Sequence, residues 1–171
     1  IDGVVLSHYH SYHAISLKKL ASGFKVDSVY LPIPQNEQEA TVLDSIYLGL
    51  KDTKTKIYVY ESNVPIDILG GELKVSERAF NAEYTHPSVA LSYTLGDRKI
   101  ALVERPYFDS YLELNRRFEE EILQSEVVIF GGDGHMPDNR FEIFYNLKKG
   151  AEIVFCDREH LLTSDFEKYL S

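Results

Sequence analysis

The stretch Ser7-His8-Tyr9-His10-Ser11-Tyr12-His13 decides how the rest of the sequence is interpreted. It holds three of the chain's six histidines. Its first residue, Ser7, ends the run Asp2–Ser7, a short β-branched and apolar segment that predicts a buried strand. Histidines on a tight loop at a strand end can turn their imidazoles toward one ion. We therefore predict a metal site, with zinc as first choice and manganese or iron as alternatives. The simpler alternative is a polar loop whose histidines only form local hydrogen bonds.

Outward from this loop, strands and helices alternate at both ends of the chain. His13–Leu20 has apolar residues at helical spacing, and Gly23 is its predicted C-cap. The other predicted helices are Asn36–Leu50, Tyr107–Gln124, Glu142–Leu147 and Asp165–Leu170, and the other strands are Val26–Leu31 (stopped by Pro32 and Pro34), Lys56–Tyr60, Glu126–Phe130 and Glu152–Cys156. Short apolar runs within 64–103, broken at Gly70-Gly71 and Gly96-Asp97, predict hairpins. This pattern predicts a single α/β domain over residues 1–171 with a mixed sheet.

The composition restricts the class of protein and its partners. Of 171 residues, 44% are hydrophobic and 26% charged, which allows a sizeable core and excludes a disordered or fibrous chain. No apolar stretch approaches the ~20 residues that cross a bilayer, so we expect no membrane span in this fragment. The net charge of −9 means that a nucleic acid would need a local basic patch or bound metal. The lone Cys156 excludes an intrachain disulfide and a Cys-rich zinc module.

The histidine loop resembles the metal signature of the metallo-β-lactamase fold, in which a strand ends in Ser/Thr-His-x-His-x-Asp-His and runs into a helix. Later segments resemble the same family in the expected order. They are His86-Pro87-Ser88-Val89-Ala90-Leu91, the hairpin Gly96–Val103, and Ser125–Gly131 followed by Gly134-His135-Met136-Pro137. The resemblance covers nearly the whole chain and implies an αββα sandwich with mixed sheets. Because the family's opening strands are missing, we expect a fragment of a longer chain, incomplete at its N-terminus.

The resemblance also implies a set of metal ligands. His8, His10 and His86 would form a first site, and His13 and His135, with Glu104 as a bridge, would form a second one. Tyr12 stands where the family has a metal-binding Asp, and Glu104-Arg105 replaces its Gly-Asp motif. A phenol with a pKa near ~10 is a poor substitute for a carboxylate. We therefore expect at most one well-bound ion per chain.

Three functions follow from this pattern. The first is a metal-dependent hydrolase, as the resemblance to the metallo-β-lactamase fold implies. The segments Tyr30-Leu31-Pro32, Asn36–Leu50 and Ile68–Val75 further resemble the soluble domain of ComEC-type competence (DNA-uptake) proteins. That resemblance implies a phosphodiesterase or nuclease acting on DNA, joined to a membrane channel domain of the same parent chain and located outside the cytoplasm; otherwise we expect a cytoplasmic location. The second is a catalytically degenerate domain with a binding or structural role. The third is an unrelated α/β module, in which His86 and His135 would lie far from His8.

The remaining candidate residues carry alternatives. Asp133 is either a ligand or a turn residue. His160 sits among charges without a partner motif, which indicates a surface residue. Tyr9 and Tyr12 either stack on a substrate base or, more simply, fill the loop and pack on the core.

Overall fold

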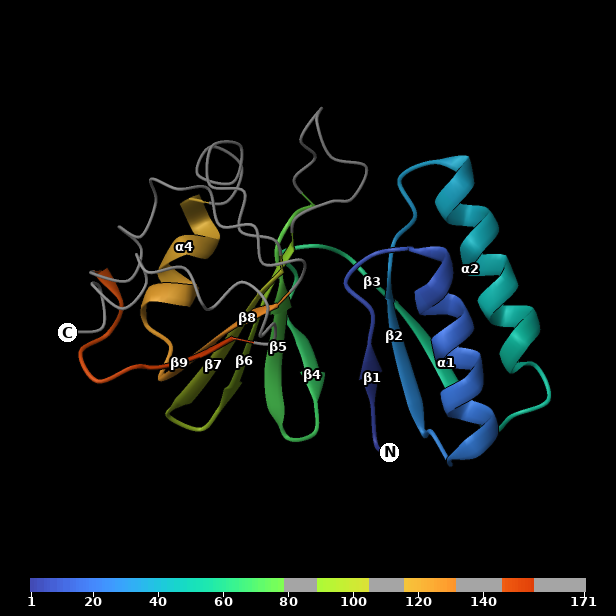
Figure 1. Ribbon diagram of the computed structural model, residues 1–171, viewed down its shortest axis with the longest axis horizontal. Coiled ribbons are helices and arrows are strands. Elements are labelled where there is room, and N and C mark those ends of the chain that lie inside the picture. The colour runs from blue at the N-terminus through green and yellow to red at the C-terminus, as the bar shows by residue number, and fades with distance from the viewer. Residues whose placement is uncertain (79–88, 105–115, 132–145, 156–171) are drawn as a thin grey trace.

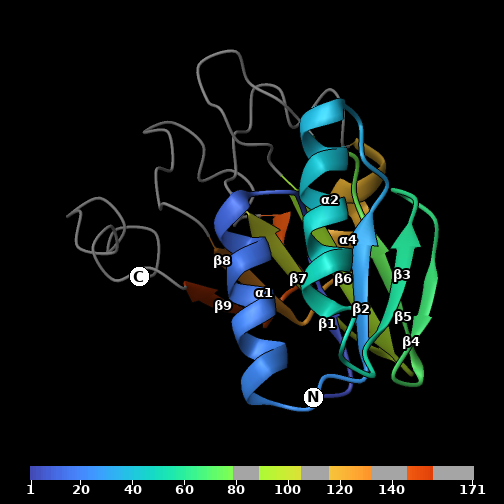
Figure 2. The ribbon, with the colours of Figure 1, turned by 90° about the vertical axis from the view of Figure 1, so that its right-hand side faces the viewer.

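Two packed sheets with helices on their outer faces form the protein (Figures 1 and 2). The computed structural model describes residues 1–78, 89–104, 116–131 and 146–155. The first sheet has three parallel strands in the order β1-β2-β3, which are β1 (Val4–Val5), β2 (Ser28–Pro32) and β3 (Lys56–Tyr60). Its helices are α1 (Ser11–Gly23) and α2 (Glu37–Leu50). Each helix connects two parallel strands, as a parallel sheet requires.

The second sheet has six strands in sequential order. They are β4 (Ile66–Ile68), β5 (Gly71–Val75), β6 (Val89–Leu95), β7 (Arg98–Glu104), β8 (Val127–Gly131) and β9 (Glu152–Phe155). Neighbours are antiparallel from β4 to β7 and parallel from β7 to β9, with α4 (Arg116–Leu123) on the outer face. The sheet is therefore mixed, and the αββα layers confirm the predicted fold class.

Within the described ranges, three apolar clusters hold these layers together. Between the first sheet and its helices lie Leu6, Leu17, Val26, Val29, Leu31, Ile46 and Leu50. Between the two sheets lie Tyr60, Ile68, Leu73, Val75, Val89 and Leu91, and Tyr30 packs against them. Between the second sheet and α4 lie Ala90, Ala101, Val103, Phe118, Ile122 and Val128. Val29 and Leu31 thus face the helices while Tyr30 faces the other sheet, as the two-residue period of a strand requires.

Both predicted hairpins are confirmed, although the first turns at Leu69-Gly70, one residue before the predicted Gly70-Gly71. In the β6–β7 turn, Leu95 pairs with Arg98, and Gly96 has a φ of 62°. In the β4–β5 turn, Ile68 pairs with Gly71, which leaves Leu69-Gly70 as a two-residue loop. Glycine adopts such positive φ values without steric cost, which explains Gly96.

Two local predictions were wrong. Gly23 is the last residue of α1 and does not adopt a left-handed cap; instead the extended Phe24 donates its backbone N–H to the Leu20 carbonyl. Pro32 does not stop the preceding strand but is the last residue of β2, where it pairs with Tyr60. Pro32 is tolerated there because β1, on the other side, pairs only with Val29 and Tyr30.

Several predicted segments lie wholly or partly outside the described residues: 107–115 of the Tyr107–Gln124 helix, 142–145 of the Glu142–Leu147 helix, Cys156 and the Asp165–Leu170 helix. Among the helices that the structure does describe, none has the length and apolar character needed to cross a membrane.

Candidate metal centre

The histidine loop joins the carboxyl end of β1 to the amino end of α1. His8 and His10 lie on the loop, and His13 lies in the first turn of α1. His10 is the extended N-cap residue, and its carbonyl accepts the backbone N–H of His13 at 3.0 Å. The ring centres are 6.2 Å apart for His8 and His10, 4.8 Å for His8 and His13, and 5.8 Å for His10 and His13. The structure therefore brings together all three histidines of the sequence motif.

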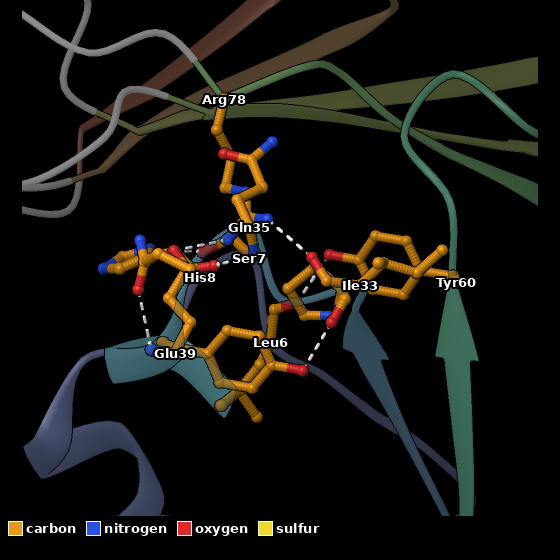
Figure 3. Close-up of polar contacts among 11 residues, drawn as sticks. Leu6, Ser7, His8, Ile33, Gln35, Glu39, Tyr60 and Arg78 are labelled. Atoms are coloured by element: carbon orange, nitrogen blue, oxygen red, sulfur yellow. Dashed lines mark hydrogen bonds and ion pairs between the residues drawn. The ribbon is translucent and has the colours of Figure 1, made fainter. Parts of the chain in front are cut away.

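Pro32 explains where this loop begins. The Leu6 N–H donates to the Tyr30 carbonyl at 3.0 Å, as a continuing parallel ladder would require. The next ladder bond would run from the N–H of residue 32 to the Leu6 carbonyl, but proline has no N–H. The hydroxyl of Tyr60 donates to that carbonyl instead, at 2.7 Å (Figure 3). The strand pairing thus ends at Leu6, and the chain is released into the histidine loop.

Ser7 orients the first histidine. Its side chain is buried, and its hydroxyl is 2.9 Å from Nδ1 of His8 (Figure 3). In the tautomer in which Nδ1–H donates to this hydroxyl, the lone pair lies on Nε2, the nitrogen that can then bind a metal. Ligand histidines are commonly fixed by such a hydrogen bond at their second ring nitrogen.

The donor type and spacing of the three imidazoles fit part of a zinc site. With Zn–N distances of about 2.0–2.1 Å, imidazoles that share an ion have ring centres on the order of 5 Å apart. Within 1–78 and the three other described ranges, however, no group of three or more His, Cys, Asp or Glu side chains is arranged to hold an ion by itself. The histidine trio therefore represents an incomplete ligand set.

The other predicted ligands fall outside the described part. This holds for His86, His135, Asp133 and the side chain of Glu104. The Tyr12 side chain and His160, which were not predicted as ligands, also lie outside it. Their convergence with His8, and the limit of one ion, remain predictions.

The strand ends next to His86, Glu104 and His135 in the chain are nevertheless described. Glu104 at the end of β7 pairs with Val89 at the start of β6 and with Gly131 at the end of β8. The segment containing His86 leads into Val89, and the one containing His135 follows Gly131. These three strand ends and the histidine loop lie at the same end of the sandwich, the upper end in Figure 1.

Sequence reasoning missed a buried polar cluster beside this loop. Nη1 of Arg78 lies 2.7 Å from Oε1 of Glu39, and Nη2 donates to the Ile33 carbonyl at 2.7 Å (Figure 3). Residues 39 positions apart carry no local signal, so no motif could have paired them. Glu39 alone had a signal, because it stands three residues after the N-cap Asn36, in the position of a capping-box carboxylate.

Tyr9 is held at the same place. Its ring packs on the core between the first sheet and its helices, and its hydroxyl donates to the Pro32 carbonyl. Burial raises the pKa of this phenol well above its ordinary value, and the charge of Arg78 offsets only part of that rise. The packing interpretation of Tyr9 is thereby confirmed.

Comparisons with known proteins find relatives by structure only. No protein-family model matches the sequence, and the search of curated proteins finds no match. The structure of Zn²⁺-bound PqqB from Methylobacterium extorquens aligns over 98% of this chain and 57% of that one, with a TM-score of 0.54 and 14% identity. The metallo-β-lactamase fold protein YhfI from Bacillus subtilis aligns over 90% of this chain and 56% of its own, with a TM-score of 0.50 and 16% identity. A mutant of the β-hydroxylase CmlA aligns over 75% and 25%, with a TM-score of 0.55 and 14% identity.

The chain thus spans little more than half the length of PqqB and YhfI, at 57% and 56%. At 14–16% identity these likenesses concern the fold and not the activity. The neighbours are metallo-β-lactamase-fold proteins, and their alignment agrees with the αββα layers. The chain has the metallo-β-lactamase fold.

Proposed function

We propose that this chain is a metal-dependent hydrolase domain in which His8, His10 and His13 contribute to the metal site. The observation that carries the proposal is the convergence of their rings, 4.8–6.2 Å between centres, at the carboxyl end of β1. The proposed first site is His8, His10 and His86, and the proposed second site is His13 and His135 with Glu104 as a bridge. The strand ends beside His86, Glu104 and His135 share this edge of the sandwich, which supports the assignment. The structural neighbours include a Zn²⁺-bound protein, which supports zinc as the metal.

The chain's own residues would orient the site. Ser7 holds the His8 ring, and the N-cap position of His10 places His13 one turn away from the loop. A metal ion bound here would lower the pKa of its water and stabilise charge on the group under attack. One zinc ion is proposed, with manganese as the alternative, since Tyr12 replaces a carboxylate of the second site.

The proposed substrate is a phosphodiester, and DNA is the proposed polymer. This step, together with the attachment to a membrane channel domain and the extracytoplasmic location, rests on the sequence resemblance to ComEC-type domains. The net charge of −9 opposes a polyanion, so attraction would have to come from the metal or a local basic pair such as Arg116-Arg117. We therefore expect weak turnover that depends on added Zn²⁺ or Mn²⁺.

One observation favours a second candidate, a degenerate domain that binds without catalysis. Tyr12 stands where a bridging or proton-handling carboxylate is expected, and Glu104 has a longer side chain than the Asp it replaces. A site without those carboxylates could still bind one ion through histidines.

The test combines metal content with hydrolysis. Protein purified without chelator is analysed for zinc and manganese, and is then assayed on bis(p-nitrophenyl) phosphate and on single- and double-stranded DNA with and without added metal. The double variant His8→Ala/His10→Ala should lose metal and activity together, whereas His160→Ala serves as the matched histidine control. Turnover that survives both chelation and the double substitution would exclude the hydrolase proposal. Metal binding without turnover would favour the degenerate domain.

A further inference from the structure

Three hydrogen bonds that involve side chains converge on residues 32–35, the end of β2 and the start of its connection to α2. The donors and acceptors are Tyr9 Oη to the Pro32 carbonyl, Arg78 Nη2 to the Ile33 carbonyl, and the Gln35 N–H to Glu39 Oε2. They come from the histidine loop, from the segment after β5 and from α2. This short connection is therefore the point at which the histidine loop is tied to both sheets.

The Arg78–Glu39 pair makes that tie rigid. The Arg78 side chain is 2% exposed and the Glu39 side chain 10%, and their atoms approach to 2.7 Å. Burying two charges is costly, and such a pair often stabilises a fold no better than apolar residues would. Nε of Arg78 is buried and forms no hydrogen bond within the described part of the chain. The pair is therefore better explained by what it positions than by the stability it adds.

Tyr9 transmits this rigidity to the histidines. Its ring packs on the core between the first sheet and its helices. Because it lies between His8 and His10 in the chain, a fixed Tyr9 restricts the backbone that carries both histidines. Its hydroxyl donates to the Pro32 carbonyl, which fixes the far end of the ring to the end of β2.

We propose that Tyr9 is a positioning residue of the metal site, and that the Arg78–Glu39 pair supports it by holding the segment to which Tyr9 is anchored. This inference rests on the proposed function, since it assigns Tyr9 an effect on metal affinity. The residues that orient ligands from outside a metal site are typically worth about 10–100-fold in affinity.

The experiment compares Tyr9→Phe with Tyr58→Phe. Both changes remove only a hydroxyl, and Tyr58 is an exposed β3 residue that stacks on Tyr30. Zinc affinity is measured by competition with a chromophoric chelator, the geometry by the visible spectrum of Co²⁺-loaded protein, and loop order by amide hydrogen exchange over residues 6–13 without metal. Tyr9→Phe should weaken zinc binding about tenfold or more, alter the Co²⁺ spectrum and speed exchange in the loop. Tyr58→Phe should do none of these.

A second variant guards against misfolding of the first. Arg78→Lys keeps a positive charge opposite Glu39 but loses the fork that also reaches the Ile33 carbonyl, so it should weaken zinc binding in the same direction. If wild-type protein binds zinc and Tyr9→Phe binds it equally well, the positioning role is wrong while the metal site stands. If wild-type protein binds no zinc, the proposed function is wrong and this role falls with it.

Discussion

The two sheets of this protein are held together in different ways. The first has three parallel strands and releases the histidine loop at its carboxyl end, where side chains from elsewhere satisfy the backbone. The second has six strands in sequential order, and its outer face is fixed to α4 by an apolar cluster and by Glu121, which binds two lysines. Single side chains from distant elements therefore decide where the histidine loop lies, whereas the larger sheet is built by pairing each strand with the next one in the sequence.

The largest expected effect comes from Arg78, the residue that connects the two regions. Arg78→Met should lower the free energy of unfolding by about 3–5 kcal/mol, because it leaves the buried Glu39 carboxylate without its partner. Urea unfolding measures the change. The matched double variant Arg78→Met/Glu39→Met should recover much of the loss, because neither charge is then stranded. A single variant that costs under about 1 kcal/mol would mean that the sheets do not depend on this connection.

Two fully buried residues allow the regions to be compared directly. Leu31 lies in the core of the first sheet and Ile122 in that of the second, and both side chains are 0% exposed. Leu31→Ala and Ile122→Ala should each cost about 3 kcal/mol in unfolding experiments. Only Leu31→Ala should also weaken zinc binding, because its cluster includes Leu6 and contacts Tyr9. Equal losses of zinc affinity in both variants would mean that the metal site does not depend on the first sheet in particular.

A smaller effect is expected at Glu121, whose carboxylate accepts hydrogen bonds from Lys74 at 3.0 Å and from Lys99. Burial raises the pKa of this carboxyl, but the two lysines lower it by more than burial raises it, so the pKa lies below its ordinary value. Glu121→Gln should cost about 1 kcal/mol at neutral pH, because the group is partly exposed. The control is Asp27→Asn, which breaks the exposed pair with Lys25 and should leave the thermal midpoint unchanged.

The pH dependence of that difference follows from its sign. A carboxyl whose folded pKa is depressed stabilises the fold above its unfolded pKa of about 4.3, and the contribution is lost as pH falls through the folded value. The hydrogen bond to Glu121 raises the pKa of Lys74, so the lysine's share is present below its unfolded pKa of about 10.4 and is lost as pH rises through the folded value. Wild type and Glu121→Gln should therefore converge in acid. If the difference in stability between wild type and Glu121→Gln stayed constant down to pH 2, the effect of the substitution would come from packing and not from charge.

The sequence predicted the elements of both sheets well, because each has a period or a turn signal of its own. Lys56–Tyr60 is a strand with the predicted bounds, and α2 begins after its cap Asn36 and ends at the predicted Leu50. The errors lie where a distant residue decides. Pro32 fits at the end of β2 only because β1 has already ended there, and no local pattern records that.

The candidate site was predicted in the same uneven way. His8, His10 and His13 form a local motif, so the sequence alone could bring them together. The residues that hold the motif in place could not be found, because they lie on other elements: Tyr60 binds the Leu6 carbonyl just before the motif, and Arg78 binds the Ile33 carbonyl. A positioning contact depends on the fold, whereas a ligand motif depends on spacing along the chain.

The smallest expected effect concerns a turn of the second sheet and has the opposite sign. Leu69 and Gly70 form the β4–β5 loop with φ values of 53° and 78°, the combination for which Asn-Gly is preferred. Leu69 is 62% exposed, so its side chain gains little from burial that would offset the strained backbone. Leu69→Asn should therefore stabilise the protein by about 0.5–1 kcal/mol in urea unfolding.

Leu95 supplies the matched control for that substitution. It is also an exposed leucine beside a hairpin turn, at 52%, but it lies within β6 and has no positive φ. If Leu69→Asn acts through the backbone, Leu95→Asn should be neutral or slightly destabilising, because asparagine is disfavoured in strands. Equal stabilisation by both variants would instead mean that replacing an exposed apolar side chain is what matters. Zinc affinity should not change in either variant, because both turns lie at the end of the sandwich opposite the histidine loop (Figure 1).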